Sequence, residues 1–322
     1  MINAYKLGTI PWSNETLEKA YWKNFKDTHE SIKQHPGYDL HERILSLKAV
    51  LRMFNKTSDS FFTALKQFHI EVHERKLFYR SRGNDLREFE EEFQEILYLF
   101  AASAMTLVDQ SRAISEKIEI PGYEERKLST FVNNHRHRFI QELRVDLIHV
   151  TLHQPNWQLS TEHDHTHITQ FMLHADQFRR SKKWHSLAKK YLREHSNGVD
   201  LGALIQEYRM QVNAFQEWLQ AAIVEAASVT IDDYHRCDRF LKAIESRCWW
   251  RALLSQVVIQ GGRDPYQYLD QYLTQSEVEE IQGLPYKSKE QVERIVEMVD
   301  DYGAYDEELQ SLVYKAFGVA VC

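Results

Sequence analysis

Two long stretches of helical periodicity, separated by one proline-glycine break, constrain the fold of this chain more than any other feature. Between residues 84 and 117 the apolar side chains recur at steps of three and four residues, at Leu86, Phe89, Phe93, Ile96, Leu97, Phe100, Ala104, Leu107 and Val108. A second apolar stripe covers residues 124–153, after the break at Pro121-Gly122. Because long amphipathic helices joined by a short turn pack antiparallel, the sequence predicts an all-α protein built on an antiparallel long-helix bundle.

The composition is typical of a helical, globular protein. Only 11 Gly and 6 Pro occur in 322 residues, too few for the turns of an all-β fold, and 43% of the residues are hydrophobic. No run reaches the roughly 18 uncharged apolar residues of a membrane span, and the first residues lack the basic and apolar segments of a signal peptide. We therefore expect a cytoplasmic protein with no membrane segment.

The three cysteines indicate neither a metal site nor a disulfide framework. Cys237, Cys248 and Cys322 do not follow any metal-ligand spacing, and an odd number cannot pair completely. We expect free thiols in a reducing compartment, and no metal or cofactor.

Breaks in the periodicity divide the chain into three expected parts. Residues 1–84 form an N-terminal helical region, in which we expect three helices separated near residues 35–37 and 57–59, where small polar residues can cap a following helix. Residues 85–227 form the bundle. Residues 228–322 form a helical C-terminal extension, in which a Gly-Gly break separates a longer helix from several shorter ones.

One segment inside the bundle departs from the helical pattern. Pro155 ends the second long helix, and residues 157–175 show the partial alternation of short strands. We expect a small β-hairpin insertion there. Helical periodicity returns at residues 181–194 and, after Asn197-Gly198, at residues 200–227.

The charge distribution favours a local rather than a general nucleic-acid surface. The formal net charge of −7 argues against a protein that coats nucleic acid without specificity. One run without acidic residues could still form a basic groove. It contains Arg179, Arg180, Lys182, Lys183, Lys189, Lys190 and Arg193. The alternative interpretation of this run is a solvated helix face.

The two long helices carry a recognisable pair of segments. The first has a centre of small residues at 101–104 and continues as Leu-Val-Asp-Gln-Ser-Arg to residue 112. The second reads Phe-Ile-Gln-Glu-Leu-Arg-x4-His, with Arg144 and His149 in the motif and Pro155 shortly after it. Over about residues 85–227 this arrangement resembles the HEPN superfamily of nucleotide- and RNA-binding helical domains.

The resemblance implies an activity and a dimer. In HEPN ribonucleases the Arg and His of an Arg-x4–6-His motif, contributed by two subunits, cleave RNA without metal, with the 2′-hydroxyl as nucleophile. Carried over, Arg144 would stabilise phosphate charge, His149 would act as acid or base, and Asp146 would orient His149. Arg136, Arg138 and the basic run would contact RNA. The resemblance also favours a homodimer in a bacterial defence or toxin-type system, with a protein partner as a further possibility.

Side-chain chemistry and helix geometry are consistent with that division of roles. A guanidinium stays charged and grips phosphate oxygens, whereas an imidazole titrates near neutral pH. Five residues at 100° each place Arg144 and His149 about 140° apart around an ideal helix. Either a partner surface or a helix irregularity is therefore needed to bring the two groups together.

Two other functions fit the same residues. Many HEPN-like domains are thought to be catalytically inactive scaffolds that bind nucleotides or proteins. Alternatively, a helical-bundle metal site could use one polar stripe of the second helix, with ligands on facing helices. The stripe consists of His135, Glu142, Asp146, His149 and His153, and the facing candidates are His69, His73 and Glu74. The histidines at 163, 165 and 167 are interpreted as part of an exposed polar loop.

Overall fold

The computed structural model describes residues 11–24, 28–73, 76–149, 156–161, 167–174 and 184–319, and it divides the chain into two compact units. One unit comprises residues 40–228, and the other comprises residues 1–39 and 229–322. The helices are α1 (Asn14–Asn24), α2 (Thr28–Ile32), α3 (Tyr38–His73), α4 (Gly83–Ser115), α5 (Tyr123–Lys127), α6 (His135–His149), α7 (Ser186–Glu194), α8 (Leu201–Ala252), α9 (Gln275–Gln282), α10 (Lys289–Val299) and α11 (Glu307–Phe317). The strands are β1 (Asn156–Thr161), β2 (His167–Leu173) and β3 (Val199–Asp200).

Four shorter helical segments complete the described elements. Two are 3-10 turns, η1 (Arg80–Arg82) and η5 (Pro265–Gln271), and two are π-helical, η2 (Leu128–Val132) and η4 (Leu253–Gln260). None of the helices in the described ranges is long and apolar enough to cross a membrane. The mostly helical fold with a small antiparallel sheet agrees with the all-α bundle and hairpin that the sequence predicts.

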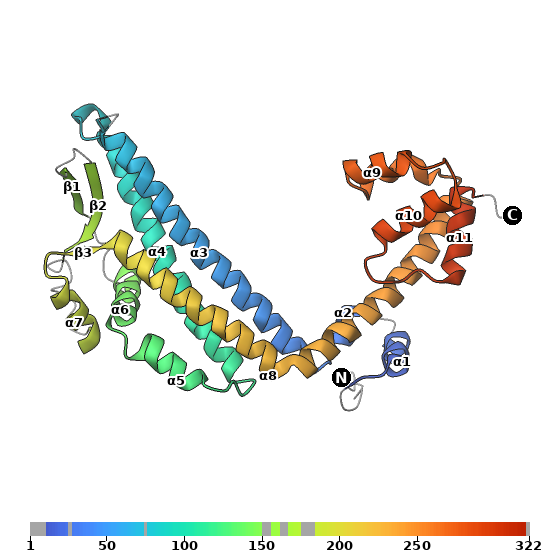
Figure 1. Cartoon of the computed structure of the whole chain (residues 1–322), viewed down its shortest axis with the longest axis horizontal. Helices are drawn as coiled ribbons and strands as arrows, with labels where there is room; N and C mark the ends of the chain where they lie inside the picture. Colours follow the sequence, from blue (N-terminus) through green and yellow to red (C-terminus); the bar gives the residue numbers. More distant parts are fainter. Residues whose placement is uncertain are drawn as a thin grey trace. The chain divides into compact units, whose positions relative to one another are not determined.

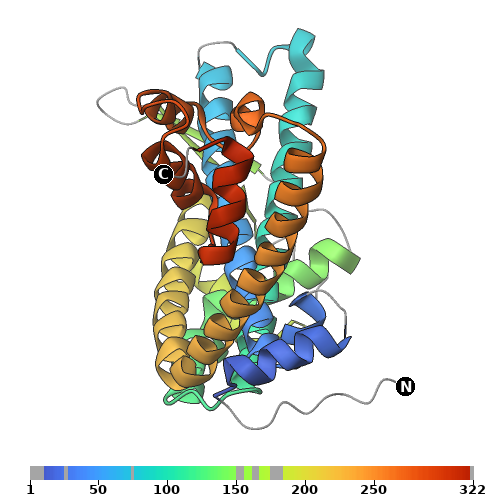
Figure 2. The same ribbon diagram turned by 90° about the vertical axis from the view of Figure 1, so that its right-hand side faces the viewer.

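The larger unit is a bundle of long helices. Within it α3, α4 and the first part of α8 run side by side in both views (Figures 1 and 2). One aromatic side chain from each helix meets at the middle, because the rings of Phe54, Phe100 and Tyr208 lie 5.3 to 6.2 Å apart. The predicted helix at 84–117 is therefore present as α4, and its apolar stripe faces this core.

The helix boundaries correct three expectations. The break expected at 57–59 is absent, because the hydroxyl groups of Thr57 and Ser58 donate to carbonyl oxygens one turn earlier, and α3 continues. The second long helix is interrupted instead: η2 ends at Val132, and Asn134 then caps α6 by accepting a hydrogen bond from the backbone of His137. The helix expected at 200–227 and the longer helix expected before the Gly-Gly break form one continuous α8, followed by η4.

The compact units also differ from the three expected parts. Helix α3, expected in an N-terminal region ending at residue 84, contributes most of its length to the same unit as α4. The first 39 residues instead belong with residues 229–322. Hydrophobic periodicity predicts the helices, but it does not specify which helices pack together.

The expected hairpin forms and gains a third strand. Strands β1 and β2 pair antiparallel, with Trp157 opposite Phe171, and β3 pairs with the end of β2. Aromatic side chains join the sheet to the bundle. Phe93 of α4 lies 4.4 Å from Phe171 and 5.2 Å from Trp157 between ring centroids, and Trp157 stacks on Phe68 of α3 at 3.5 Å.

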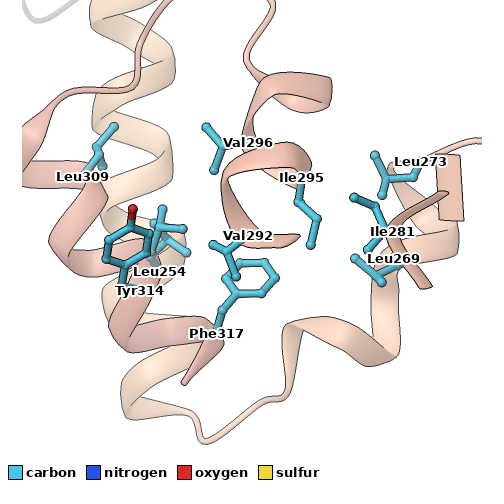
Figure 3. Close-up of a cluster of buried hydrophobic side chains, with 11 residues drawn as sticks. Leu254, Leu269, Leu273, Ile281, Val292, Ile295, Val296, Leu309, Tyr314 and Phe317 are labelled. Carbon is cyan, nitrogen blue, oxygen red and sulfur yellow. The ribbon is translucent and has the colours of Figure 1, made fainter. Parts of the chain in front are cut away.

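The smaller unit contains two apolar clusters. One joins α1, α2 and α8 and contains Trp12, Leu17, Ile32, Tyr234, Cys237, Leu241 and Ile244. The other joins η4, η5, α9, α10 and α11, and Figure 3 shows Val292 and Ile295 of α10 pointing into it. The expected Gly-Gly break ends η4. A Cβ at Gly261 would lie 2.3 Å from the Val257 carbonyl oxygen, so the close backbone approach requires glycine.

Truncating Phe93 is expected to destabilise the larger unit strongly. Its ring is fully buried among aromatic side chains from α3 and from two strands, so Phe93→Ala leaves a cavity. We expect the free energy of unfolding to fall by about 3–5 kcal/mol in urea denaturation. The control is Leu99→Ala on the same helix, which removes a 48% exposed side chain and should cost less than about 0.5 kcal/mol. Equal losses in the two variants would contradict this account of the core.

Candidate functional site

Helix α6 carries the residues of the predicted Arg-x4-His motif. Its apolar face is anchored on the bundle and on α7 by Phe139, which is fully buried and lies 5.0 Å from the ring of Tyr191 and 5.7 Å from that of Trp184. Leu143 and Leu147 continue the same buried face. This packing fixes how the helix presents its polar side chains.

Arg144 is a half-buried cation whose charge is not neutralised within the described part of the chain. Its Nε atom is buried and has no hydrogen-bond partner there, and no ion pair involves its guanidinium. The buried Nε is not accessible from solvent, but a phosphate or carboxylate oxygen can bind the exposed part of a half-buried guanidinium with a charge-assisted hydrogen bond. Arg144 is therefore placed to bind an anion.

The other two predicted catalytic residues are described to different extents. The side chain of Asp146 is 4% exposed, so it faces the interior rather than solvent. The side chain of His149 lies outside the described residues, as does any hydrogen bond between it and Asp146. The backbone of α6 is regular up to His149, so Arg144 and His149 attach to it about 140° apart. Nothing in α6 itself brings the two together.

The arginines at the start of α6 are engaged within the protein. Arg136 forms an ion pair with Glu207 of α8 and a hydrogen bond with Tyr191. Arg138 donates to the carbonyl oxygen of Val132 at 3.3 Å and to Gln141 at 2.8 Å. Both guanidinium groups tie α6 to its surroundings, which leaves fewer donors for the RNA contacts expected of them.

The described part of the basic run lies on α7. Lys189 and Lys190 are exposed, and Lys190 lies 3.8 Å from Glu194, whereas the other predicted contacts, Arg179, Arg180, Lys182 and Lys183, lie outside the described residues. Trp184 and Tyr191 are buried, so their rings belong to the core and are not available to stack on bases.

A buried histidine next to this site was not singled out by sequence reasoning. His137 is 5% exposed, and its Nδ1 atom lies 2.8 Å from the hydroxyl group of Tyr208. Burial, reinforced by the charge of Arg138, lowers the pKa of His137 to about 4, and burial raises that of Tyr208. Both groups are therefore neutral near pH 7. The sequence shows only a histidine between two arginines, and nothing in it indicates burial.

The metal ligands considered on α6 are not gathered with those on α3 within the described residues. Glu142 accepts a hydrogen bond from the backbone of His185. His69 and His73 instead both lie against the Thr169 hydroxyl of β2, at 3.0 and 3.2 Å. The position of His153 is not described, and neither is that of Glu74.

One buried cluster of potential ligands does occur, in the smaller unit. His35, Asp233 and Cys237 present ligand atoms that lie within 4.8 Å of one another. The backbone N–H of Gly37 donates to Nδ1 of His35 at 2.9 Å, so Nε2 carries the proton and donates to Asp233 at 3.1 Å. This tautomer leaves no nitrogen lone pair on His35 for a metal ion.

Hydrogen bonds to Asp233 make the cluster an anchor for the N-terminal segment. The carboxylate accepts from the backbone of Trp12 at 3.2 Å and from Arg236 at 2.9 Å. Burial raises the pKa of Asp233, but the bonds from His35, Arg236 and Trp12 outweigh it and hold the pKa below the usual value. Burial also raises the pKa of Cys237 to about 11, so its thiol is not an activated nucleophile.

No family model, curated protein or solved structure matches the chain. The candidate site is therefore defined by its own residues. Arg144 is its centre because it combines burial, positive charge and the lack of a partner within the described residues.

The His137 environment predicts a loss of stability at acid pH. With a pKa of about 4 in the folded state and about 6.5 in the unfolded state, the unfolded chain binds a proton first as pH falls. The contribution of His137 to the free energy of unfolding is constant above about pH 6.5. It decreases between about pH 6.5 and about pH 4, and the loss is about 2 kcal/mol at pH 5. In His137→Gln the fall in unfolding free energy from pH 7 to pH 5 should be smaller by that amount. His235→Gln, at an exposed histidine, is the control.

The hydrogen bonds of Asp233 predict a difference in stability between a second pair of variants. Asp233→Asn removes the buried carboxylate to which His35 and Arg236 donate, and we expect it to lower the unfolding free energy by about 2–3 kcal/mol. Asp232→Asn changes the exposed neighbour and should cost less than about 0.5 kcal/mol. Thermal denaturation of both variants tests this prediction, which would be refuted by equal melting temperatures.

Proposed function

We propose that this chain binds RNA at the α6 surface around Arg144 and cleaves it without metal, with Arg144 and His149 contributed by two copies of the chain. The observation that carries the proposal is the half-buried guanidinium of Arg144, which forms no ion pair among the described residues. RNA offers phosphate oxygen atoms for this guanidinium group at every nucleotide. The resemblance of the surrounding sequence to HEPN ribonucleases supplies the reaction class.

In the proposed reaction the nucleophile comes from the RNA itself. The 2′-hydroxyl loses its proton to one His149 and attacks the adjacent phosphorus, while Arg144 binds the non-bridging oxygens as negative charge develops there. The bond from phosphorus to the 5′-oxygen breaks, and the second His149 donates a proton to that oxygen. The products are a 2′,3′-cyclic phosphate and a free 5′-hydroxyl.

The positions of Arg144 and His149 around α6 are the reason why the proposed site needs two copies of the chain. Because α6 is regular up to His149, Arg144 and His149 attach about 140° apart on one chain. Two α6 helices related by a two-fold axis would bring the Arg144 of one copy toward the His149 of the other. The proposal therefore includes a homodimer.

Substitution of Arg144 tests the binding and cleavage steps separately. Arg144→Ala is expected to lower cleavage of a mixed RNA pool, measured in excess chelator, by about 100-fold or more. It should also weaken binding of RNA and reduce the salt dependence of binding by about one released counterion. The matched control is Arg52→Ala, which removes an exposed arginine of α3 in the same unit and should leave both unchanged.

The outcomes distinguish the parts of the proposal. Cleavage with cyclic phosphate ends that is lost in both Arg144→Ala and His149→Ala supports the full mechanism. Binding that depends on Arg144, without cleavage by the unaltered chain, overturns the nuclease and leaves an RNA-binding scaffold. Binding and cleavage that are unchanged in Arg144→Ala overturn the proposal altogether.

A further inference from the structure

The C-terminal helices of the smaller unit enclose a cleft that the proposed function does not use. It has a volume of about 420 Å³, within the range of small-molecule sites in proteins, and all its lining residues lie between residues 250 and 317. Its walls come from the end of α8, from η4 and η5, and from α10 and α11. Figure 3 shows Leu254, Ile295 and Phe317, which line the cleft, within the adjoining apolar cluster.

The cleft is apolar along its length. Valine, leucine, isoleucine, tryptophan and phenylalanine make up most of its lining. Leu253 and Val257 of η4 are 39% and 40% exposed, so apolar surface that a ligand could cover remains in contact with water. The wall they form is π-helical, a rare conformation that recurs at functional sites.

One cation lies in the lining of the cleft. Arg263 is the single charged residue among the described lining residues. Its side chain is exposed and forms no ion pair or hydrogen bond within the described part of the chain. Tyr268, which also lines the cleft, has a hydroxyl group without a hydrogen-bond partner among the same residues. A guanidinium and a phenol are donors suited to a carboxylate.

We propose that this cleft binds a small amphipathic monocarboxylate, such as a medium-chain fatty acid, with its alkyl chain along η4 and its carboxylate at Arg263 and Tyr268. The apolar walls account for the chain, and the unneutralised guanidinium accounts for the charge. The volume fits one such molecule. This site is independent of Arg144 and α6, because its lining residues belong to the other compact unit.

The proposal is tested with the full chain and two matched ligands. Dodecanoate and dodecanol share an alkyl chain and differ in charge, and both are titrated calorimetrically below their aggregation limits. We expect one saturable site for dodecanoate. Arg263→Gln should weaken dodecanoate binding about three-fold, as expected for an exposed ion pair, and leave dodecanol unchanged. Arg239→Gln removes an exposed arginine of the same unit that does not line the cleft, and it should change neither.

A cleft-filling variant tests the location. Val257→Trp adds bulk at a 40% exposed lining position and should weaken both ligands at least ten-fold, and Leu253→Trp serves the same purpose if the first variant fails to fold by circular dichroism. The proposal is overturned if dodecanoate binding does not saturate or if both folded variants bind normally. It is also overturned if the unaltered chain binds no dodecanoate and the same variants dissociate a dimer, because a second copy then occupies the cleft.

Discussion

The packing of the small sheet on α3 and α4 is the interaction on which the larger unit depends. Phe93 lies at its centre, in ring contact with Phe61 and Phe68 of α3, Trp157 of β1 and Phe171 of β2. A short hairpin is only marginally stable in water, so this apolar contact keeps the sheet folded. Strands β1 and β2 lie between α6 and α7 in the sequence, and β3 follows α7.

The sequence predicts helices well where periodicity alone decides them. Helix α4 runs from Gly83 to Ser115, close to the predicted 84–117, because its apolar stripe is long and lacks competing signals. The hairpin was also evident, since alternation replaces the helical period there. Boundaries that depend on polar side chains were less predictable. Ser58 satisfies its hydroxyl group on its own helix, whereas Asn134 caps a new one, and the two cannot be told apart from local sequence.

The sequence proposes residues for the candidate site, but it does not predict their environment. The context of the surrounding sequence singled out Arg144, whereas its half-burial and its lack of an ion pair among the described residues are properties of the packed structure. Arg136 and Arg138 carry the same charge and are engaged by Glu207, Gln141 and the Val132 carbonyl oxygen, although the Nε of Arg136 also has no hydrogen-bond partner among the described residues. His35 and Asp233 are 198 residues apart, so no local pattern could pair them.

In the π-helical segment η4, the number of residues matters for the C-terminal architecture as well as their type. Its turns close through hydrogen bonds to the fifth preceding residue, as from Gly261 to Gln256, and so contain about one residue more than α-helical turns. Deleting one residue there would allow the ordinary α-helical repeat to form and would rotate the following segment by about 100° around the helix axis. The segment should therefore tolerate apolar exchanges better than insertions or deletions, which would shift the Gly-Gly turn out of register with the helices that pack beside it.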